Sequence, residues 1–310
     1  MKKIAFIFPG QGSQAVGMGK SLIERHAAGK EMLDAASAAL GYDMGKLLFE
    51  ENDCLGQTRY TQPAILFVSL LAHKLFENEL PIKPVYAMGH SLGELSAVAA
   101  MGGLSLADAL NVAAKRGEWM QAACDGVGAG MMVTLGLSDQ AAEEACKAAQ
   151  AEGKKVWPAN YNSDGQIVMA GVKADLASME ERFKAAGAKR AMLLDMSVAS
   201  HCPILQSAVE PLKNLLNEKL QANLIAPVIA NATGEAYQTK DKAVALLADQ
   251  LVKPVRYKQG IAAIENEIDL FIEFGHGGIL KGLNKKNTAK PTISVGTADE
   301  LEQALEEAAK

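Results

Sequence analysis

Val85-Tyr86-Ala87-Met88-Gly89-His90-Ser91-Leu92-Gly93-Glu94-Leu95-Ser96-Ala97 runs from an apolar, strand-like piece through a tight turn into a helix-forming segment. The turn reads Gly-x-Ser-x-Gly, a pattern in which the serine takes a strained backbone and projects its hydroxyl from the top of a sheet. Gly89 and Gly93 lack Cβ atoms, so neighbouring backbone can come close. The helix beginning at Leu92 aims free N–H groups at the serine, as an oxyanion requires. The segment therefore predicts that Ser91 is a nucleophile, although the pattern alone also fits an ordinary glycine turn.

The composition is that of a globular chain. Its 310 residues are 49% hydrophobic and 22% charged, which suffices for a large core and a smaller second domain. The net charge of −5 gives no sign of nucleic acid or an anionic membrane as a partner. No segment reaches the ~18 apolar residues of a membrane span. Cys54, Cys124, Cys146 and Cys202 show neither paired spacing nor a zinc signature, which predicts reduced thiols in a cytoplasmic protein.

Apolar, strand-like segments alternate with helix-forming segments along most of the chain. Residues 3–8, 85–88 and 270–274 are apolar runs, apart from Lys3 and Glu273, as expected for strands buried on both faces. Their alternation with helices predicts an α/β fold with a parallel sheet. Two of the runs end in glycine-rich loops, at 9–14 and 275–278, and ligands bind at that end of the strands in open α/β sheets.

Several helices can be placed between these strands. Residues 18–40 predict a helix that is interrupted near Gly29, and residues 62–79 predict a second helix with Pro63 in its first turn. Ser105 is a good N-cap for a further helix.

The middle of the chain follows a different order of elements. We expect strand, helix, strand, strand, helix and strand at 131–137, 139–151, 156–160, 166–170, 175–186 and 190–194. This order matches a ferredoxin-like unit. We therefore predict an inserted small domain at 129–196 and a large domain made of 1–128 and 197–310.

A serine nucleophile needs a base, and the chain has five histidines. His201 lies in an irregular segment before a helix and follows Ser91 in the order usual for hydrolases; His276, at a strand end, stays a second candidate. No Asp or Glu stands in a loop that would orient His201, so Gln250 or any backbone carbonyl could accept its second ring N–H. Arg116 is either an ordinary solvated side chain or a bidentate clamp for a carboxylate.

Four motifs together resemble a known family. They are Pro9-Gly10-Gln11-Gly12-Ser13-Gln14, Thr61-Gln62-Pro63-Ala64, Gly89-His90-Ser91-Leu92-Gly93-Glu94 and Ser200-His201. Their order and spacing are similar to those of malonyl-CoA:acyl carrier protein transacylases, the acyltransferases that supply type II fatty acid synthesis. Asn160-Tyr161-Asn162-Ser163 and Gln166-Ile167-Val168 are similar as well. The resemblance spans nearly the whole chain and implies an α/β-hydrolase-like large domain with a ferredoxin-like insertion.

The resemblance also assigns roles to the residues that match the family's motifs. Ser91 would be the nucleophile and His201 its base and later acid. Gln250 would orient His201, in the family through a backbone carbonyl, which accounts for the missing acid.

Two further roles concern the acyl group. Arg116 would hold the free carboxylate of malonyl, and Gln11 with the Leu92 N–H would form the oxyanion hole. The family often has Gly-Pro-Gly-Lys where this chain has Gly275-His276-Gly277-Gly278, which leaves the role of His276 open, and it often has proline at Ala199.

The resemblance implies malonyl-CoA and acyl carrier protein as partners, a monomer, and no cofactor or metal beyond the coenzyme A thioester that serves as substrate. Neither nucleic acid nor a membrane is expected as a partner. Two other functions share parts of this site: a serine esterase or thioesterase, which usually has an acid partner and needs no clamp, and a non-catalytic carrier-binding module. Use of methylmalonyl, and service to a polyketide pathway, stay open.

Overall fold

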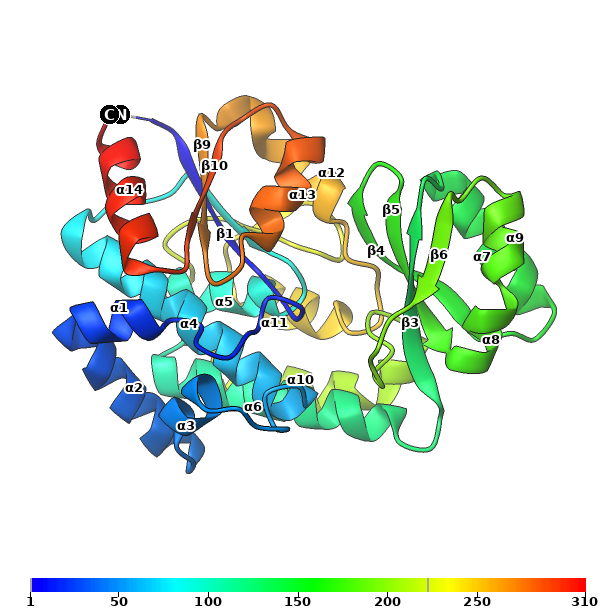
Figure 1. The fold of residues 1–310 in the computed structure, drawn as a ribbon, viewed down its shortest axis with the longest axis horizontal. Coiled ribbons are helices and arrows are strands. Elements are labelled where there is room, and N and C mark those ends of the chain that lie inside the picture. The colour runs from blue at the N-terminus through cyan, green and yellow to red at the C-terminus, as the bar shows by residue number, and fades with distance from the viewer. Residues whose placement is uncertain (1, 222) are drawn as a thin grey trace.

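The computed structural model describes residues 2–221 and 223–310, and it contains two separate β-sheets. Met1 and Ala222, both within the expected large domain, lie outside the described residues. Figure 1 shows the larger sheet with its helices on one side of the molecule and the smaller sheet on the other.

The larger sheet has six strands in the order β10-β9-β1-β2-β7-β8. The strands are β1 (Ile4–Phe8), β2 (Tyr86–Gly89), β7 (Val228–Ile229), β8 (Ala236–Tyr237), β9 (Leu270–Phe274) and β10 (Thr292–Val295). All neighbouring pairs are parallel except β7 and β8. Every residue of β1 and β9 is buried, as their apolar runs predict. The expectation of an α/β fold with a parallel sheet is confirmed.

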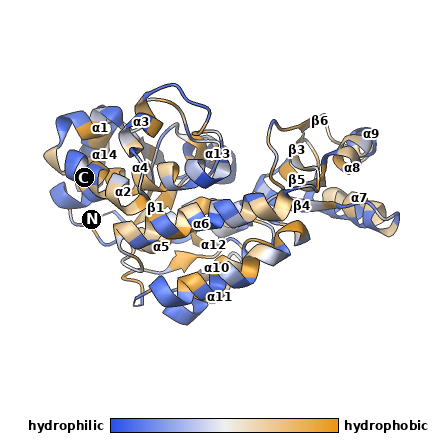
Figure 2. Ribbon diagram, turned by 90° about the horizontal axis from the view of Figure 1, so that it is seen from below, coloured by the Kyte–Doolittle hydropathy of each residue, from blue (hydrophilic) through white to orange (hydrophobic). Residues whose placement is uncertain are grey.

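Helices pack on both faces of this sheet. They are α1 (Lys20–Arg25), α2 (Ala27–Leu40), α3 (Met44–Phe49), α4 (Thr58–Glu79), α5 (Leu92–Ala100), α6 (Leu106–Cys124), α10 (Gln206–Lys219), α11 (Lys240–Asp249), α12 (Tyr257–Ile264), α13 (Ile279–Asn287) and α14 (Ala298–Ala309). Phe6 belongs to the core cluster that includes α4, α5 and α6, and its neighbour Ile7 to the cluster that includes α12 and α13. Side chains that alternate along a strand thus fill two cores. In Figure 2, β1 carries the apolar colour, while α10 and α11 mix apolar and hydrophilic residues.

The smaller sheet is antiparallel, with the order β4-β5-β3-β6. Its elements are β3 (Ala129–Leu135), α7 (Asp139–Ala151), β4 (Val156–Ser163), β5 (Gln166–Val172), α8 (Lys173–Ser178), α9 (Glu180–Ala185) and β6 (Arg190–Leu193). Met132 and Phe183 lie in a core shared by this sheet and its own helices. Met131, on the opposite side of β3, belongs to the core of the main body. One face of the sheet is therefore turned toward the larger sheet.

Three of the predicted helices differ in the structure. The break in the first lies at His26, which is extended between α1 and α2, and not at Gly29. Gly29 lies inside α2. A Cβ there would come within 2.8 Å of the backbone of Ile23 in α1, so the close contact between the two helices requires glycine at this position. Pro63 lies in the second turn of α4, since that helix begins at Thr58. The single helix expected at 175–186 is two helices, α8 and α9.

Ser105 caps α6 as predicted, because its side chain accepts a hydrogen bond from the N–H of Asp108. Within residues 2–221 and 223–310, none of the helices combines the length and the apolar character that crossing a membrane requires.

Candidate active site

Ser91 stands on the corner between β2 and α5. Its φ of 55° and ψ of −111° lie outside the regions that a side chain with a Cβ normally adopts. A Cβ on Gly89 would come within 1.9 Å of the Gly93 backbone, and a Cβ on Gly93 within 1.9 Å of the Phe8 carbonyl. The two glycines are therefore required by close backbone contacts between β1, β2 and α5. The Ser91 N–H donates to Oδ1 of Asn231 at 2.7 Å, which holds the corner in place.

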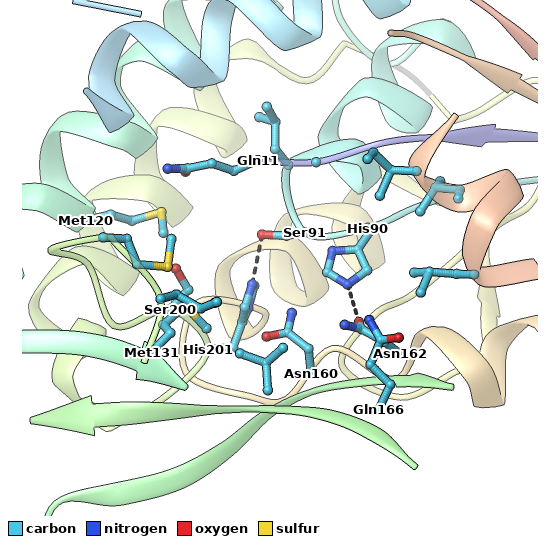
Figure 3. A pocket seen from close by; sticks show the side chains of 18 of the residues that line it. Gln11, His90, Ser91, Met120, Met131, Asn160, Asn162, Gln166, Ser200 and His201 are labelled. Carbon is cyan, nitrogen blue, oxygen red and sulfur yellow. Dashed lines mark hydrogen bonds between the residues drawn. The ribbon is translucent and has the colours of Figure 1, made fainter. Parts of the chain in front are cut away.

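His201 lies against the serine from the other side. Its Nε2 is 2.8 Å from Ser91 Oγ, as the dashed line in Figure 3 marks, and its Nδ1 is 2.7 Å from the backbone carbonyl oxygen of Gln250. A carbonyl only accepts, so Nδ1 carries the proton and Nε2 is free to accept the serine hydroxyl proton. Burial and the nearby Arg116 lower the pKa of His201 to about 3. The imidazole is therefore neutral, as a general base must be.

Arg116 reaches the same place from α6 and is buried, with 3% of its surface exposed. Its Nη1 donates to Oε1 of Gln62 at 2.7 Å, and its Nη2 donates to Oε1 of Gln250 at 2.8 Å and to Ser91 Oγ at 3.2 Å. Burial lowers the pKa of Arg116 to about 10, so the guanidinium stays charged at neutral pH. Of the two interpretations of this arginine, the solvated side chain is wrong.

Gln250 joins these groups through its side chain as well as its backbone. Its Nε2 donates to Oε2 of Glu94 at 2.6 Å and to the Ser91 carbonyl at 3.0 Å. Glu94 also accepts from the N–H of Asn231 at 2.9 Å and from the Tyr237 hydroxyl at 2.9 Å. Burial raises the pKa of Glu94 to about 7, against the lowering effect of these donors and of Arg116.

Four of the residues in this network had no role predicted from the sequence. They are Gln62, Glu94, Asn231 and Tyr237. Glu94 offered one signal in the sequence, since it is the only charged residue in the mostly apolar segment that forms α5 (Leu92–Ala100). The other three carry no such signal, because they come from distant segments that only the fold brings together.

The two residues expected at the oxyanion hole lie beside Ser91 but in different ways. Leu92 is the first residue of α5, so its N–H has no acceptor within the helix. The side chain of Gln11 donates to Oγ1 of Thr58 at 3.3 Å and points away from the Ser91 hydroxyl in Figure 3. A role of Gln11 at the oxyanion hole stays a prediction.

These side chains surround a cavity of about 200 Å³. The smaller sheet supplies one wall, including Met131, Asn160, Asn162 and Val168. His90 points along this wall in Figure 3, with its Nε2 2.7 Å from Oδ1 of Asn162. The cavity thus lies between the two sheets and is open to the polar groups around Ser91, and its volume suits a small acyl group.

His276 lies elsewhere. It lines a different cavity, of about 390 Å³, together with Lys281 and Lys285 of α13. Of the two histidines left open by the sequence, the one beside the serine is therefore His201. Among residues 2–221 and 223–310, no three His, Cys, Asp or Glu side chains are grouped so that they could hold a metal ion.

Comparisons with known proteins point to one family. The acyl transferase domain family matches residues 5–300. A malonyl CoA-acyl carrier protein transacylase of Bacillus subtilis is 38% identical over 309 residues, which cover 99% of this chain and 97% of the relative. The crystal structure of malonyl-CoA:acyl carrier protein transacylase from Helicobacter pylori superposes with a TM-score of 0.97 at 46% identity, covering 100% of this chain and 99% of that one.

A second similar solved structure contains a complex with another protein. It is described as a type II PKS acyl-carrier protein in complex with its malonyl-transacylase, and it is similar to this chain with a TM-score of 0.94 at 34% identity. The match covers 98% of this chain and 99% of that one.

Proposed function

The chain belongs to the acyl transferase domain family, and from this premise we propose that it is a malonyl-CoA:acyl carrier protein transacylase. It moves a malonyl group from coenzyme A to the phosphopantetheine thiol of acyl carrier protein, in fatty acid synthesis. The resemblance seen in the sequence is confirmed by these relatives. The observation that best supports the activity is the position of Arg116, a buried cation whose Nη2 lies 3.2 Å from the Ser91 hydroxyl.

The first half-reaction forms an acyl-enzyme. Ser91 Oγ attacks the thioester carbonyl while Nε2 of His201 takes its proton, and the C–S bond then breaks as the imidazolium gives that proton to the departing thiolate. The low pKa of His201, about 3, makes the imidazolium a strong acid. It therefore returns the proton readily, and coenzyme A leaves as the thiol.

The negative charge that develops on the carbonyl oxygen needs donors at the corner. The N–H groups of Leu92 and Gln11 are the donors that this proposal assigns to it, and removing one such donor typically costs about 3 kcal/mol of transition-state stabilisation. The dipole of α5, whose first residue is Leu92, favours the same charge.

The second half-reaction reverses the first with a different thiol. The phosphopantetheine thiol of the carrier gives its proton to His201 and attacks the malonyl-serine ester, and the serine oxygen takes the proton back. Each thiol uses the same site in turn, so the kinetics are ping-pong.

Arg116 accounts for the choice of acyl group. Its guanidinium pairs with the free carboxylate of malonyl in two parallel hydrogen bonds. An acetyl group would leave this buried cation without that partner, and sites with buried polar groups discriminate strongly against ligands that cannot pair them.

The domain description fits this family. We propose an α/β-hydrolase-like large domain at 1–128 and 197–310 and a ferredoxin-like insertion at 129–196. The strand order β4-β5-β3-β6 in an antiparallel sheet, with helices between the first and second and the third and fourth strands, supports the ferredoxin-like assignment. A monomer, a cytoplasmic location and the absence of a cofactor stay predictions from the sequence.

A transfer assay tests the function against hydrolysis. Malonyl-CoA, acetyl-CoA and methylmalonyl-CoA are offered in competition with a purified carrier protein, and the acyl-carrier products and free acids are measured separately. We expect malonyl-carrier to dominate, with little free malonate. Release of the free acid without a dependence on carrier thiol would instead identify a thioesterase.

A further inference from the structure

Glu94 is a fully buried carboxyl group on α5 to which the mechanism above gives no part, with none of its surface exposed. Its side chain lies one helical turn beyond Ser91. Burying an ionised carboxylate is costly unless it is paired and hydrogen-bonded. A buried carboxyl so close to the candidate active site therefore needs a physical explanation.

The surroundings of Glu94 are arranged for a negative charge. Its carboxylate accepts from the Asn231 N–H, the Tyr237 hydroxyl and the Gln250 side-chain amide, at 2.9, 2.9 and 2.6 Å. All of these groups act as donors, and a carboxylate surrounded by donors is favoured in its ionised form.

Gln250 links this anion to the guanidinium of Arg116. Its Oε1 accepts from Arg116 Nη2 at 2.8 Å, while its Nε2 donates to Glu94. An amide has one accepting end and one donating end, so the two charges fix its orientation. The titratable groups that face Glu94 are Arg116 from α6 and Tyr237 from β8, and the charge of Glu94 in turn raises the pKa of Arg116 against the effect of burial.

We infer that Glu94 is the internal counter-ion of Arg116 and that it limits how tightly the site holds an acyl carboxylate. The inference rests on the proposed function, in which Arg116 pairs that carboxylate. When malonyl is bound, two anions share one buried guanidinium. The malonyl-serine ester is then less stable than it would be beside an unpaired arginine, and the malonyl group passes on to the next thiol. Glu94 is a positioning residue, because it acts through Gln250 and Arg116.

Glu94→Gln removes the charge and keeps the shape. The amide oxygen can accept from Asn231 and Gln250, and the amide nitrogen can donate to the Tyr237 hydroxyl, which is able to accept. The experiment measures the equilibrium between acyl-CoA plus free enzyme and acyl-enzyme plus coenzyme A, by intact mass, for malonyl and for acetyl. It is run at about pH 8.5, where a carboxyl of pKa about 7 is ionised.

We expect Glu94→Gln to raise the equilibrium constant for forming the malonyl-enzyme roughly tenfold. This is the effect of removing one negative charge about 12 Å from the malonyl carboxylate at an effective dielectric constant of about 20. The acetyl constant should stay unchanged, because acetyl carries no charge. Structural damage would instead change both constants together, and that result would overturn the inference.

Tyr237→Phe is the matched control. It removes one donor from the same carboxylate. Because that donor lowers the pKa of Glu94, the control and the unchanged chain are compared at about pH 9, where the carboxyl of both is ionised. The charge is then kept, and the ratio of the malonyl and acetyl constants should stay as in the unchanged chain. A rise in that ratio as large as in Glu94→Gln would show that the lost hydrogen bond, and not the lost charge, is responsible, and would overturn the inference.

A second measurement needs no substitution at Glu94. Carboxyl-carbon NMR of the unchanged chain, labelled in its glutamates, follows the titration of Glu94 in the acetyl-enzyme and the malonyl-enzyme. The counter-ion account predicts a higher pKa of Glu94 in the malonyl-enzyme, and equal pKa values would contradict it. If the unchanged chain forms no malonyl-enzyme at all, the proposed function itself fails, which is a separate and recognisable outcome.

Discussion

Nδ1 of His201 lies 2.7 Å from the backbone carbonyl oxygen of Gln250, at the position where serine hydrolases commonly place a carboxylate. A carbonyl fixes the same tautomer as a carboxylate but brings no full negative charge to stabilise the imidazolium. The imidazolium is therefore a short-lived proton carrier in this site. That suits a reaction in which the leaving group and the incoming nucleophile are both thiols, which are far more acidic than water.

Replacing Arg116, the proposed carboxylate clamp, should change the preference for malonyl over acetyl more than the ability of the enzyme to transfer an acyl group. We expect Arg116→Ala to lower kcat/KM for malonyl-CoA by roughly 10²- to 10³-fold, the loss of about 3–4 kcal/mol from a charge-assisted bidentate pair. Acetyl-CoA should gain relative to malonyl-CoA. The measurement is acyl-carrier formation from each thioester, and Arg59→Ala, which removes an exposed arginine, is the control. If malonyl still greatly outcompetes acetyl in Arg116→Ala, the clamp is wrongly assigned.

The two glycines that flank the serine should tolerate no side chain. A Cβ on Gly93 would come within 1.9 Å of the Phe8 carbonyl, so we expect Gly93→Ala to destabilise the fold by more than about 3 kcal/mol, as overpacking against backbone does. Gly282→Ala, inside α13 with open space around its Cβ, should stabilise by up to about 1 kcal/mol. Urea unfolding of both variants measures the difference, and equal stabilities would contradict the argument.

A buried histidine that does not line the cavity around Ser91 should make the fold sensitive to acid. Burial lowers the pKa of His73 to about 4, where it packs among Phe6, Phe8 and Phe274. The unfolded chain binds a proton there below about pH 6.5, so the contribution of His73 to stability is present above that pH and is lost as the pH falls toward 4.

At pH 5 this contribution has fallen by about 2 kcal/mol, from 1.5 pKa units at about 1.4 kcal/mol each. Between pH 8 and pH 5, the free energy of unfolding of His73→Phe should therefore fall by about 2 kcal/mol less than that of the unchanged chain. The free energy of unfolding of each protein is measured with urea at both pH values. The effect of the substitution on packing is the same at the two pH values, so it cancels in the difference. Parallel curves for the two proteins would show that His73 does not titrate as stated.

The main sheet could be predicted because its strands are buried on both faces. The expected runs 3–8 and 270–274 correspond to β1 and β9, since a strand without solvent contact is mostly apolar, with the buried Glu273 of β9 as the exception. Helix boundaries were harder to predict. The sequence predicts a helix break at Gly29, but this glycine lies within α2. It is glycine because the backbone of the neighbouring helix α1 occupies the space where a side chain would be.

The candidate site also contains residues that local sequence predicts and residues that only the packing of distant segments brings together. Ser91 could be predicted from its own turn, because the strain and the glycines are local. For Arg116 and Gln250 the residues alone left alternatives open and only the family resemblance chose between them, since their proximity to Ser91 depends on how α6 and the end of α11 pack around the corner. The hydrogen bond between Glu94 and Tyr237 joins residues 143 positions apart, and no local pattern reports such a contact.

The central claim is that the hydroxyl of Ser91 receives the malonyl group from coenzyme A. Its most direct test incubates the unchanged chain and Ser91→Ala with malonyl-CoA in the absence of carrier, followed by intact mass and peptide mapping. We predict one malonyl adduct on the peptide that contains Ser91, removable by carrier thiol, and no adduct in Ser91→Ala. A malonyl adduct on another residue, or undiminished transfer by Ser91→Ala, would contradict the account.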